Sequence, residues 1–158
     1  MLWKVWSDGQ GWILATLLHA GTKFLGMKTI LLIDDDQQVR EVFGLALRRS
    51  GYYVIEAHSG GSGIEMARKH LPDLILSDIL MQEGDGPTLL RDIRRDPELK
   101  FTQVVLMTGS PDLATPCKGV EELVADDFLV KPVDLQTLLS CVQARIRSCP
   151  HPSVFARL

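Results

Sequence analysis

The chain has 158 residues, of which 46% are hydrophobic and 23% are charged, a balance that suits one folded domain and excludes a disordered polyelectrolyte. Its 17 lysines and arginines are outnumbered by 20 aspartates and glutamates, so the net charge of −3 provides no basic excess for nucleic-acid binding. The three cysteines form no Cys-x-x-Cys pair, which argues against a disulfide framework or a zinc site. We therefore expect a cytoplasmic protein with reduced thiols and no direct nucleic-acid partner.

The first segment, residues 1–26, differs from the rest because it holds all three tryptophans and four glycines without a clear periodicity. Its apolar run WILATLL, at 12–18, is far shorter than the roughly 20 residues of a spanning helix, so we expect no membrane insertion. Met27 then begins the run MKTILLIDDD, which resembles the N-terminus of a protein. This favours an extension or leader at 1–26; the alternative is an extra helix that packs on a partner.

Five short apolar runs predict five β-strands. Several are apolar at consecutive positions, which is typical of strands covered on both faces, as in a parallel sheet. In chain order the runs are ILLI at 30–33, YVI at 53–55, LIL at 74–76, VVLM at 104–107 and FLV at 128–130.

The stretches between these runs predict helices. The first ends before Gly51, the second at Pro72 and the third before Pro97. Prolines crowd the space before EELVA at 121–125, so the fourth helix is expected to be short or irregular and to end at Asp126, and the fifth begins after a capping Asp134. The apolar stripes expected to be buried are Val39, Val42, Phe43, Ala46 and Leu47 in the first helix and Leu135, Leu138, Leu139, Val142 and Ile146 in the fifth.

Strands that alternate with helices predict an α/β fold, a (βα)5 flavodoxin-like doubly wound parallel sheet with strand order 2-1-3-4-5. We expect this domain at residues 27–148, followed by a short tail at 149–158. Such sheets bind ligands at the carboxyl ends of their strands. The residues expected there are Asp34, Asp35 and Asp36 after the first strand, Ser77 and Asp78 in the third, Thr108, Gly109 and Ser110 in the fourth, and Lys131 and Pro132 after the fifth.

Strands one and three are neighbours in this order, so Asp34 and Asp35 should lie beside Asp78. Carboxylates about 4–6 Å apart repel each other by roughly 3–4 kcal/mol per pair at an effective dielectric constant near 20. A hard divalent cation with oxygen ligands offsets this repulsion, and Lys131 adds one compact positive charge. A single aspartate at a strand end is usually a turn or helix-cap residue, a role that fits Asp36, but the combined set indicates a functional site.

Four motifs stand in a familiar order and spacing over about residues 28–147. They are ILLIDDD, DLILSD followed by DG at 85–86, VVLMTGS and ADDFLVKP. On these motifs the chain resembles response-regulator receiver domains, and is similar to the stand-alone chemotaxis and cell-cycle regulators. The resemblance implies a two-component or phosphorelay protein that modifies itself and has no separate substrate, rather than an enzyme.

The same resemblance implies a phosphoacceptor and a metal site. Asp78 would receive a phosphoryl group from a sensor histidine kinase or a histidine phosphotransfer protein. Mg2+ would be held directly by Asp35, through water by Asp34, and also by Asp78 and the backbone carbonyl of Leu80.

It further implies a switch. Thr108 and Lys131 would bind the phosphoryl group, and Phe128 would be the switch aromatic that turns inward. The peptide bond before Pro132 would be cis. A downstream protein partner would bind the face formed by the fourth helix, the fifth strand and the fifth helix.

Three alternatives stay open at this stage. One is a receiver fold that is never phosphorylated and acts only as an interaction module, and another is a fragment of a longer regulator. The third is a haloacid-dehalogenase-like phosphatase, in which the lysine lies between the hydroxyl and the acidic pair, whereas here it follows the acids. That alternative would use Asp34-x-Asp36, Thr108, Lys131 and the pair Asp126 and Asp127, and it leaves Asp78 without a role.

Overall fold

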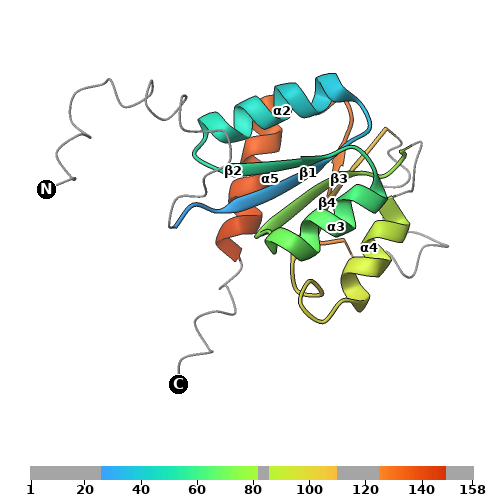
Figure 1. Ribbon diagram of the computed structural model, residues 1–158. Coiled ribbons are helices and arrows are strands. Elements are labelled where there is room, and N and C mark those ends of the chain that lie inside the picture. Colours follow the sequence, from blue (N-terminus) through green and yellow to red (C-terminus); the bar gives the residue numbers. More distant parts are fainter. Residues whose placement is uncertain (1–25, 82–85, 110–124, 149–158) are drawn as a thin grey trace, which may run out of the picture.

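The computed structural model describes residues 26–81, 86–109 and 125–148. Strands and helices alternate along this part of the chain as far as β4 (Figure 1). The elements are β1 (Thr29–Ile33), α2 (Gln37–Arg49), β2 (Tyr53–Ala57), α3 (Gly60–His70), β3 (Leu74–Asp78), α4 (Gly86–Arg95), β4 (Gln103–Thr108), β5 (Asp127–Val130) and α5 (Leu135–Ser148). The fourth predicted helix, expected to end at Asp126, falls on residues 110–124 and so lies outside the described residues.

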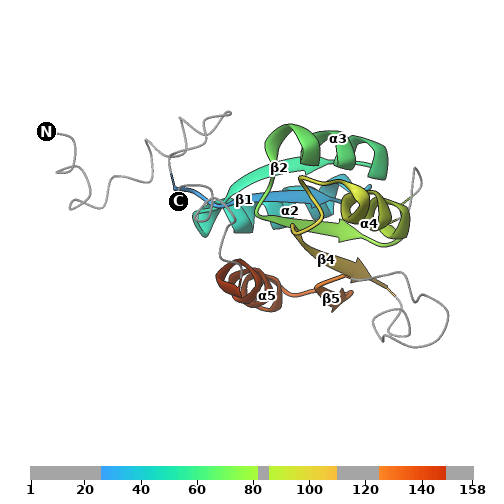
Figure 2. The same ribbon diagram turned by 90° about the horizontal axis from the view of Figure 1, so that it is seen from below.

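The five strands form one parallel sheet in the order β2-β1-β3-β4-β5, which confirms the predicted topology. Helices α2 and α5 pack on one face, and α3 and α4 pack on the other (Figures 1 and 2). Crossovers between parallel strands place helices on both faces, so the central strands β1 and β3 are buried on both sides. The fold is therefore the doubly wound α/β arrangement that the sequence indicated.

Side chains of each strand alternate between two apolar clusters. In β1, Ile30 and Leu32 join the cluster under α2 and α5, whereas Leu31 and Ile33 join the one under α3 and α4. All five residues of β1 and all five of β3 are buried. This double burial explains why these strands are apolar at consecutive positions instead of alternating. It also makes β1 and β3 a rigid base for the residues that follow them.

The stripe predicted for the first helix is only partly correct. Phe43 and Leu47 are buried in the core, but Val42 is 52% exposed. Helix α2 packs on β1, β2 and α5 at one end of the sheet, so its buried stripe is narrower than the spacing suggested. In α5, Leu138 and Val142 are buried as predicted, but Leu135 is 42% exposed because the buried contacts of this helix begin one turn later.

The helix ends follow the local signals in the sequence. Asp36 caps α2, its carboxylate accepting hydrogen bonds from the backbone N–H groups of Gln38 and Val39. Gly51 follows that helix with a φ of +88°, a left-handed conformation that costs glycine little. The Asp134 carboxylate accepts from the Thr137 N–H at the start of α5. In the described ranges no helix combines the length and apolar character that crossing a membrane would require.

Candidate functional site

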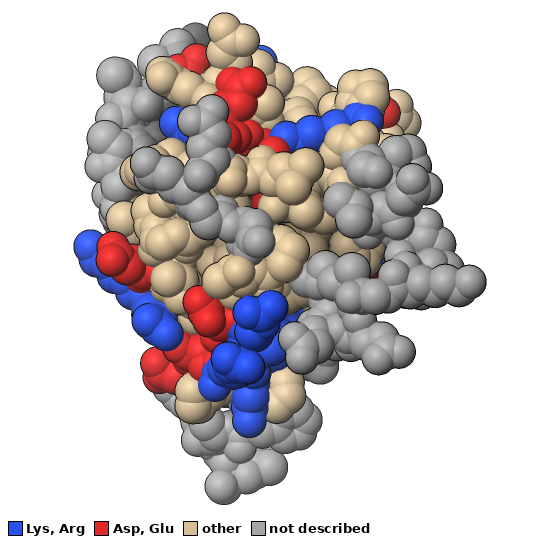
Figure 3. Space-filling model, turned by 90° about the vertical axis from the view of Figure 1, so that its right-hand side faces the viewer, with Lys and Arg blue, Asp and Glu red and all other residues tan. Residues whose placement is uncertain are grey.

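The strands end together on one side of the molecule, where they present the acidic residues. Figure 3 views the molecule from this side and shows exposed acidic side chains near the top, with a Lys or Arg side chain beside them. Asp34 directly follows β1 and Asp78 is the last residue of β3. The β1–β3 register pairs Ile33 with Ser77, so Asp34 and Asp78 come next to each other at this edge.

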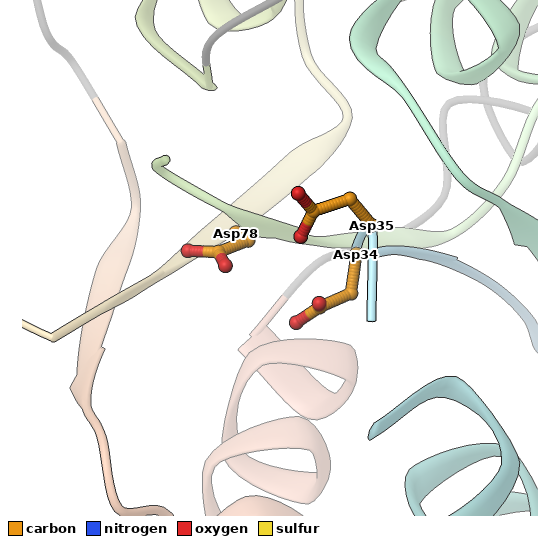
Figure 4. Close-up of side chains that lie close together, drawn as sticks. All are labelled: Asp34, Asp35 and Asp78. Carbon is orange, nitrogen blue, oxygen red and sulfur yellow. The ribbon is translucent and has the colours of Figure 1, made fainter. Parts of the chain in front are cut away.

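Three carboxylates gather there. Oxygens of Asp34, Asp35 and Asp78 all lie within 4.8 Å of one another (Figure 4). Asp34 is fully buried and Asp78 is 7% exposed, whereas Asp35 lies on the surface. The site is therefore open to solvent on one side and rests on the core on the other. An all-oxygen donor set of this kind is what a hard divalent cation such as Mg2+ prefers.

Lys131, which directly follows the edge strand β5, brings a positive charge to these carboxylates. Its Nζ lies 2.7 Å from Asp78 Oδ2 and 3.0 Å from Asp34 Oδ2, so one ammonium group bridges two carboxylates. Burial alone would lower the pKa of Lys131, but its hydrogen bonds with Asp78 and Asp34 raise that pKa above the ordinary value. Lys131 is therefore positively charged at neutral pH.

The Lys131 ammonium is placed by the backbone around it. The Lys131 N–H donates to the carbonyl oxygen of Thr108 at 2.7 Å, which continues the β4–β5 pairing beyond Val130. The Lys131–Pro132 peptide bond is cis, the isomer that the resemblance implied.

The surroundings of Asp34 disfavour its negative charge in some respects and favour it in others. Its burial is the main reason that its pKa lies above the ordinary value, and the nearby Asp78 raises it further. Hydrogen bonds oppose this shift: the Asp36 N–H donates to Asp34 Oδ1 at 3.0 Å, and Lys131 donates to Oδ2. Burial thus makes the charged form of Asp34 more costly than that of an exposed aspartate, and a bound cation would offset part of this cost. This is an electrostatic reason for a cation at the site.

The remaining predicted residues surround this centre. Thr108 is fully buried at the end of β4. The Leu80 N–H donates to Asp78 Oδ1 at 3.2 Å, while the Leu80 side chain is 65% exposed. Phe128 is partly buried and packs against the apolar cluster under α3 and α4. The structure therefore brings Lys131 and Leu80 into direct contact with Asp78. It places Thr108 on β4, the strand next to β3, and Phe128 on β5, the strand next to β4.

Two residues that shape the site were not among the predicted site residues. Arg40, on α2, donates from Nη1 to the carbonyl oxygens of Asp34 and Asp35, at 2.7 and 3.1 Å. Gly86 begins α4 so close to β3 that a Cβ would lie 2.7 Å from the carbonyl oxygen of Asp78. The DG motif at 85–86 drew attention to Gly86 without its reason, whereas Arg40 followed the acidic run with no distinguishing signal.

The acids needed for the phosphatase alternative lie elsewhere. Asp126, just before β5, accepts hydrogen bonds from Arg94 at 2.7 Å and from the Val104 N–H at 2.7 Å. Asp127 pairs with Arg145 of α5 at 2.8 Å. Asp126 precedes β5 and Asp127 is the first residue of that strand, whereas Lys131 follows it, and Asp36 is engaged as a helix cap. The structure therefore engages the acidic pair of that alternative in ion pairs with Arg94 and Arg145.

Comparisons with known proteins point to one family. The family model for the response regulator receiver domain matches residues 30–143. The transcriptional regulatory protein AfsQ1 of Streptomyces coelicolor is 36% identical over 121 residues, which cover 77% of this chain and 52% of that protein. Protein PilH of Pseudomonas aeruginosa is 33% identical over 118 residues, which cover 75% of this chain and 97% of PilH.

Solved structures agree. The chemotaxis response regulator CheY4 of Vibrio cholerae superposes with a TM-score of 0.67 at 30% identity, covering 75% of this chain and 98% of CheY4. The chain spans about half the length of the first curated relatives it matches, which are longer regulators. The matched region includes β1 to β5 and the whole carboxylate–lysine group. The chain belongs to the response regulator receiver family of two-component systems.

Proposed function

We propose that Asp78 is the phosphoacceptor of this receiver domain and that its modification switches a partner-binding surface. The observation that supports this proposal best is the ammonium group of Lys131, which bridges Asp78 and Asp34 beside a third carboxylate. Phosphoryl transfer needs positioning and charge neutralisation more than covalent chemistry from the protein. The site offers a carboxylate nucleophile, a fixed cation and a set of oxygen ligands in one place.

The transfer itself involves one bond made and one broken. An Asp78 carboxylate oxygen attacks the phosphorus of a phosphohistidine donor, and the P–N bond breaks as its electron pair returns to the imidazole. The product is an aspartyl phosphate, a mixed anhydride. The Lys131 ammonium, already hydrogen bonded to Asp78 and charged at neutral pH, stabilises the negative charge on the phosphoryl oxygens.

The carboxylates of Asp34, Asp35 and Asp78 would hold Mg2+, and the backbone carbonyl of Leu80 would complete the protein ligands. The donor set fits, because one carboxylate oxygen from each residue lies within 4.8 Å of the others and all of them are the hard oxygen ligands that Mg2+ prefers. When bound, Mg2+ supplies charge neutralisation for the carboxylates and for the phosphoryl oxygens.

Thr108 and Phe128 would convert modification into a change of surface. A phosphoryl group adds about −1.5 to −2 charges, so the Thr108 hydroxyl on the neighbouring strand would move to donate to it. That movement vacates space behind β4, into which the half-buried Phe128 would turn. Phosphorylation of Asp78 would thereby shift the equilibrium between two conformations of the surface around Phe128.

We also propose the partners and extent of this unit. A sensor histidine kinase or histidine phosphotransfer protein would donate the phosphoryl group, and a downstream protein would bind the face that includes β5 and α5. Val130 and Leu135 on these elements are 41% and 42% exposed, which gives that face apolar contact area. The unit would comprise residues 27–148.

The test is the intact mass of the protein after incubation with a small-molecule phosphodonor, with and without Mg2+. We expect one added phosphoryl group that requires Mg2+ and is lost in Asp78→Asn. The matched control is Asp92→Asn, which changes an exposed aspartate on α4 and should leave the addition intact. If no group is added although Mg2+ binds, the domain acts as an unphosphorylated interaction module and the proposal is wrong.

A further inference from the structure

The turn between β1 and α2 carries two of the three carboxylates, so whatever holds this turn determines where they lie. Arg40 reaches back from α2 and donates from Nη1 to the carbonyl oxygen of Asp34 at 2.7 Å and to that of Asp35 at 3.1 Å. One guanidinium nitrogen thus bridges two successive carbonyl groups.

These two carbonyls belong to the peptide units on either side of Asp35. The Asp34 carbonyl is part of the unit that precedes Asp35, and the Asp35 carbonyl is part of the unit that follows it. Fixing both units fixes φ and ψ at Asp35, and so the direction of its Cα–Cβ bond. Asp34 is fixed in addition by complete burial, but Asp35 lies on the surface, where the core does not restrain it.

The dipole of α2 does not favour an arginine at this position. The N-terminus of a helix carries the positive end of its dipole, so a cation there is destabilising, and α2 has no acidic residue in its first turn. The cap of this helix is supplied by Asp36, whose carboxylate accepts from Gln38. The contribution of Arg40 therefore lies in the turn that it bridges.

We propose that Arg40 is a positioning residue for the metal site, holding the peptide units around Asp35 so that its carboxylate faces Asp34 and Asp78. The inference rests on the proposed function, in which Asp35 is a Mg2+ ligand. Residues that orient metal ligands typically change metal affinity by about 10–100-fold when they are removed.

Charge and positioning predict opposite effects, which makes the inference testable. A guanidinium beside a cation site repels the cation, so loss of its charge alone would tighten Mg2+ binding. Loss of the bridge to the two carbonyls would loosen the turn and weaken binding. The sign of the change in affinity therefore separates the two roles.

The experiment measures Mg2+ binding by isothermal titration calorimetry for the full chain and for Arg40→Met, Arg40→Lys and Arg49→Met. Arg49 is exposed at the far end of the same helix, so its variant removes the same charge without touching the turn. We expect Arg40→Met to weaken Mg2+ binding about tenfold. Arg40→Lys, which keeps the charge but loses the planar guanidinium, should weaken it less, and Arg49→Met should leave it unchanged.

A second readout separates positioning from a general loss of stability. The Mg2+ concentration that gives half-maximal phosphorylation should rise in Arg40→Met, while the rate at saturating Mg2+ stays near that of the parent protein. Unchanged or tighter Mg2+ binding in Arg40→Met overturns the inference and leaves the proposed function intact. If that variant does not fold, Arg40→Lys decides, and an affinity equal to the parent's overturns the inference. If the parent protein binds no Mg2+, both proposals are wrong.

Discussion

The Nζ atom of Lys131 lies 2.7 Å from Oδ2 of Asp78, although the two residues are 53 positions apart in the chain. The contact joins the ends of β5 and β3, which are separated in the sheet by β4. Lys131 reaches Asp34, at the end of β1, in the same way. The Lys131 side chain therefore reaches from β5 past β4 to the ends of β3 and β1. Its positive charge offsets the repulsion between the carboxylates that the fold brings together.

Neutralising Asp34 should stabilise the metal-free protein while removing its metal site. Burial raises the pKa of Asp34 above its unfolded value, so the folded state binds more protons and its stability falls as pH rises from about 3.8 through the raised pKa. Asp34→Asn keeps an oxygen that can accept from the Asp36 N–H. We expect a higher melting temperature than the parent at pH 7 without Mg2+, and no further rise when Mg2+ is added.

The control for that experiment is the same pair of melting curves at pH 3, below the unfolded pKa of Asp34. There the parent carboxylate is protonated in both states, so the gain from Asp34→Asn should shrink. A variant that is less stable than the parent at pH 7 would show that the ion pair with Lys131 outweighs the burial of the charge.

Substitution of Gly86 should damage the phosphoacceptor through the backbone. A Cβ at this position would lie 2.7 Å from the Asp78 carbonyl oxygen and 2.9 Å from Ile79 Cα, so α4 or the end of β3 must shift. We expect Gly86→Ala to lower the free energy of unfolding by about 1–3 kcal/mol and to slow the phosphorylation of Asp78. Urea denaturation and the intact-mass assay measure the two effects.

Gly61→Ala is the matched control, because a Cβ there meets nothing within 4 Å. It lies in helix α3, where alanine is favoured over glycine, so stability should be equal or higher. Equal behaviour of the two variants would contradict the close packing of Gly86 against β3.

The cap of α3 should be worth a measurable share of the stability. The Ser59 hydroxyl accepts from the Ser62 N–H, and the Ser59 N–H donates to the Ser62 hydroxyl, which together form a capping box. Ser59→Ala should lower the free energy of unfolding by about 1 kcal/mol. A double-mutant cycle with Ser62→Ala should give non-additive losses, because both variants break the same pair of bonds. Strict additivity would mean that the two hydroxyls act independently.

Cys141 should be an unreactive thiol. Burial, and then the nearby Asp127 carboxylate, raise its pKa to about 11. At pH 8 on the order of one thiol in a thousand is then ionised, and only the thiolate reacts with alkylating reagents. In a background with Cys117→Ser and Cys149→Ser, alkylation by iodoacetamide should be far slower than in the urea-unfolded protein. Adding Asp127→Asn to this background should speed the alkylation of Cys141. An equal rate with and without Asp127→Asn would show that Asp127 has no influence on the thiol.

The sequence by itself determined the strands, their parallel arrangement and most of the site. Strands buried on both faces need apolar residues at consecutive positions, so β1 and β3 are visible in the sequence. The order 2-1-3-4-5 was the flavodoxin-like choice among the doubly wound orders, and the structure confirms it. Asp34, Asp35, Asp78 and Lys131 could be predicted because the carboxyl ends of parallel strands meet at one edge. Local caps such as Asp36 were equally clear, since they depend only on neighbours in the chain.

Only the tertiary structure decided which side chains are covered and which backbone groups are bound. Val42 fits an apolar stripe, yet it is exposed because the width of the buried stripe depends on what packs against α2. The bridge from Arg40 to two carbonyls and the close approach of Gly86 to Asp78 are contacts with backbone, which leave no pattern in side-chain type. Lys131 was predicted at this edge, but its position between two carboxylates follows from the spacing of β1, β3 and β5 in three dimensions.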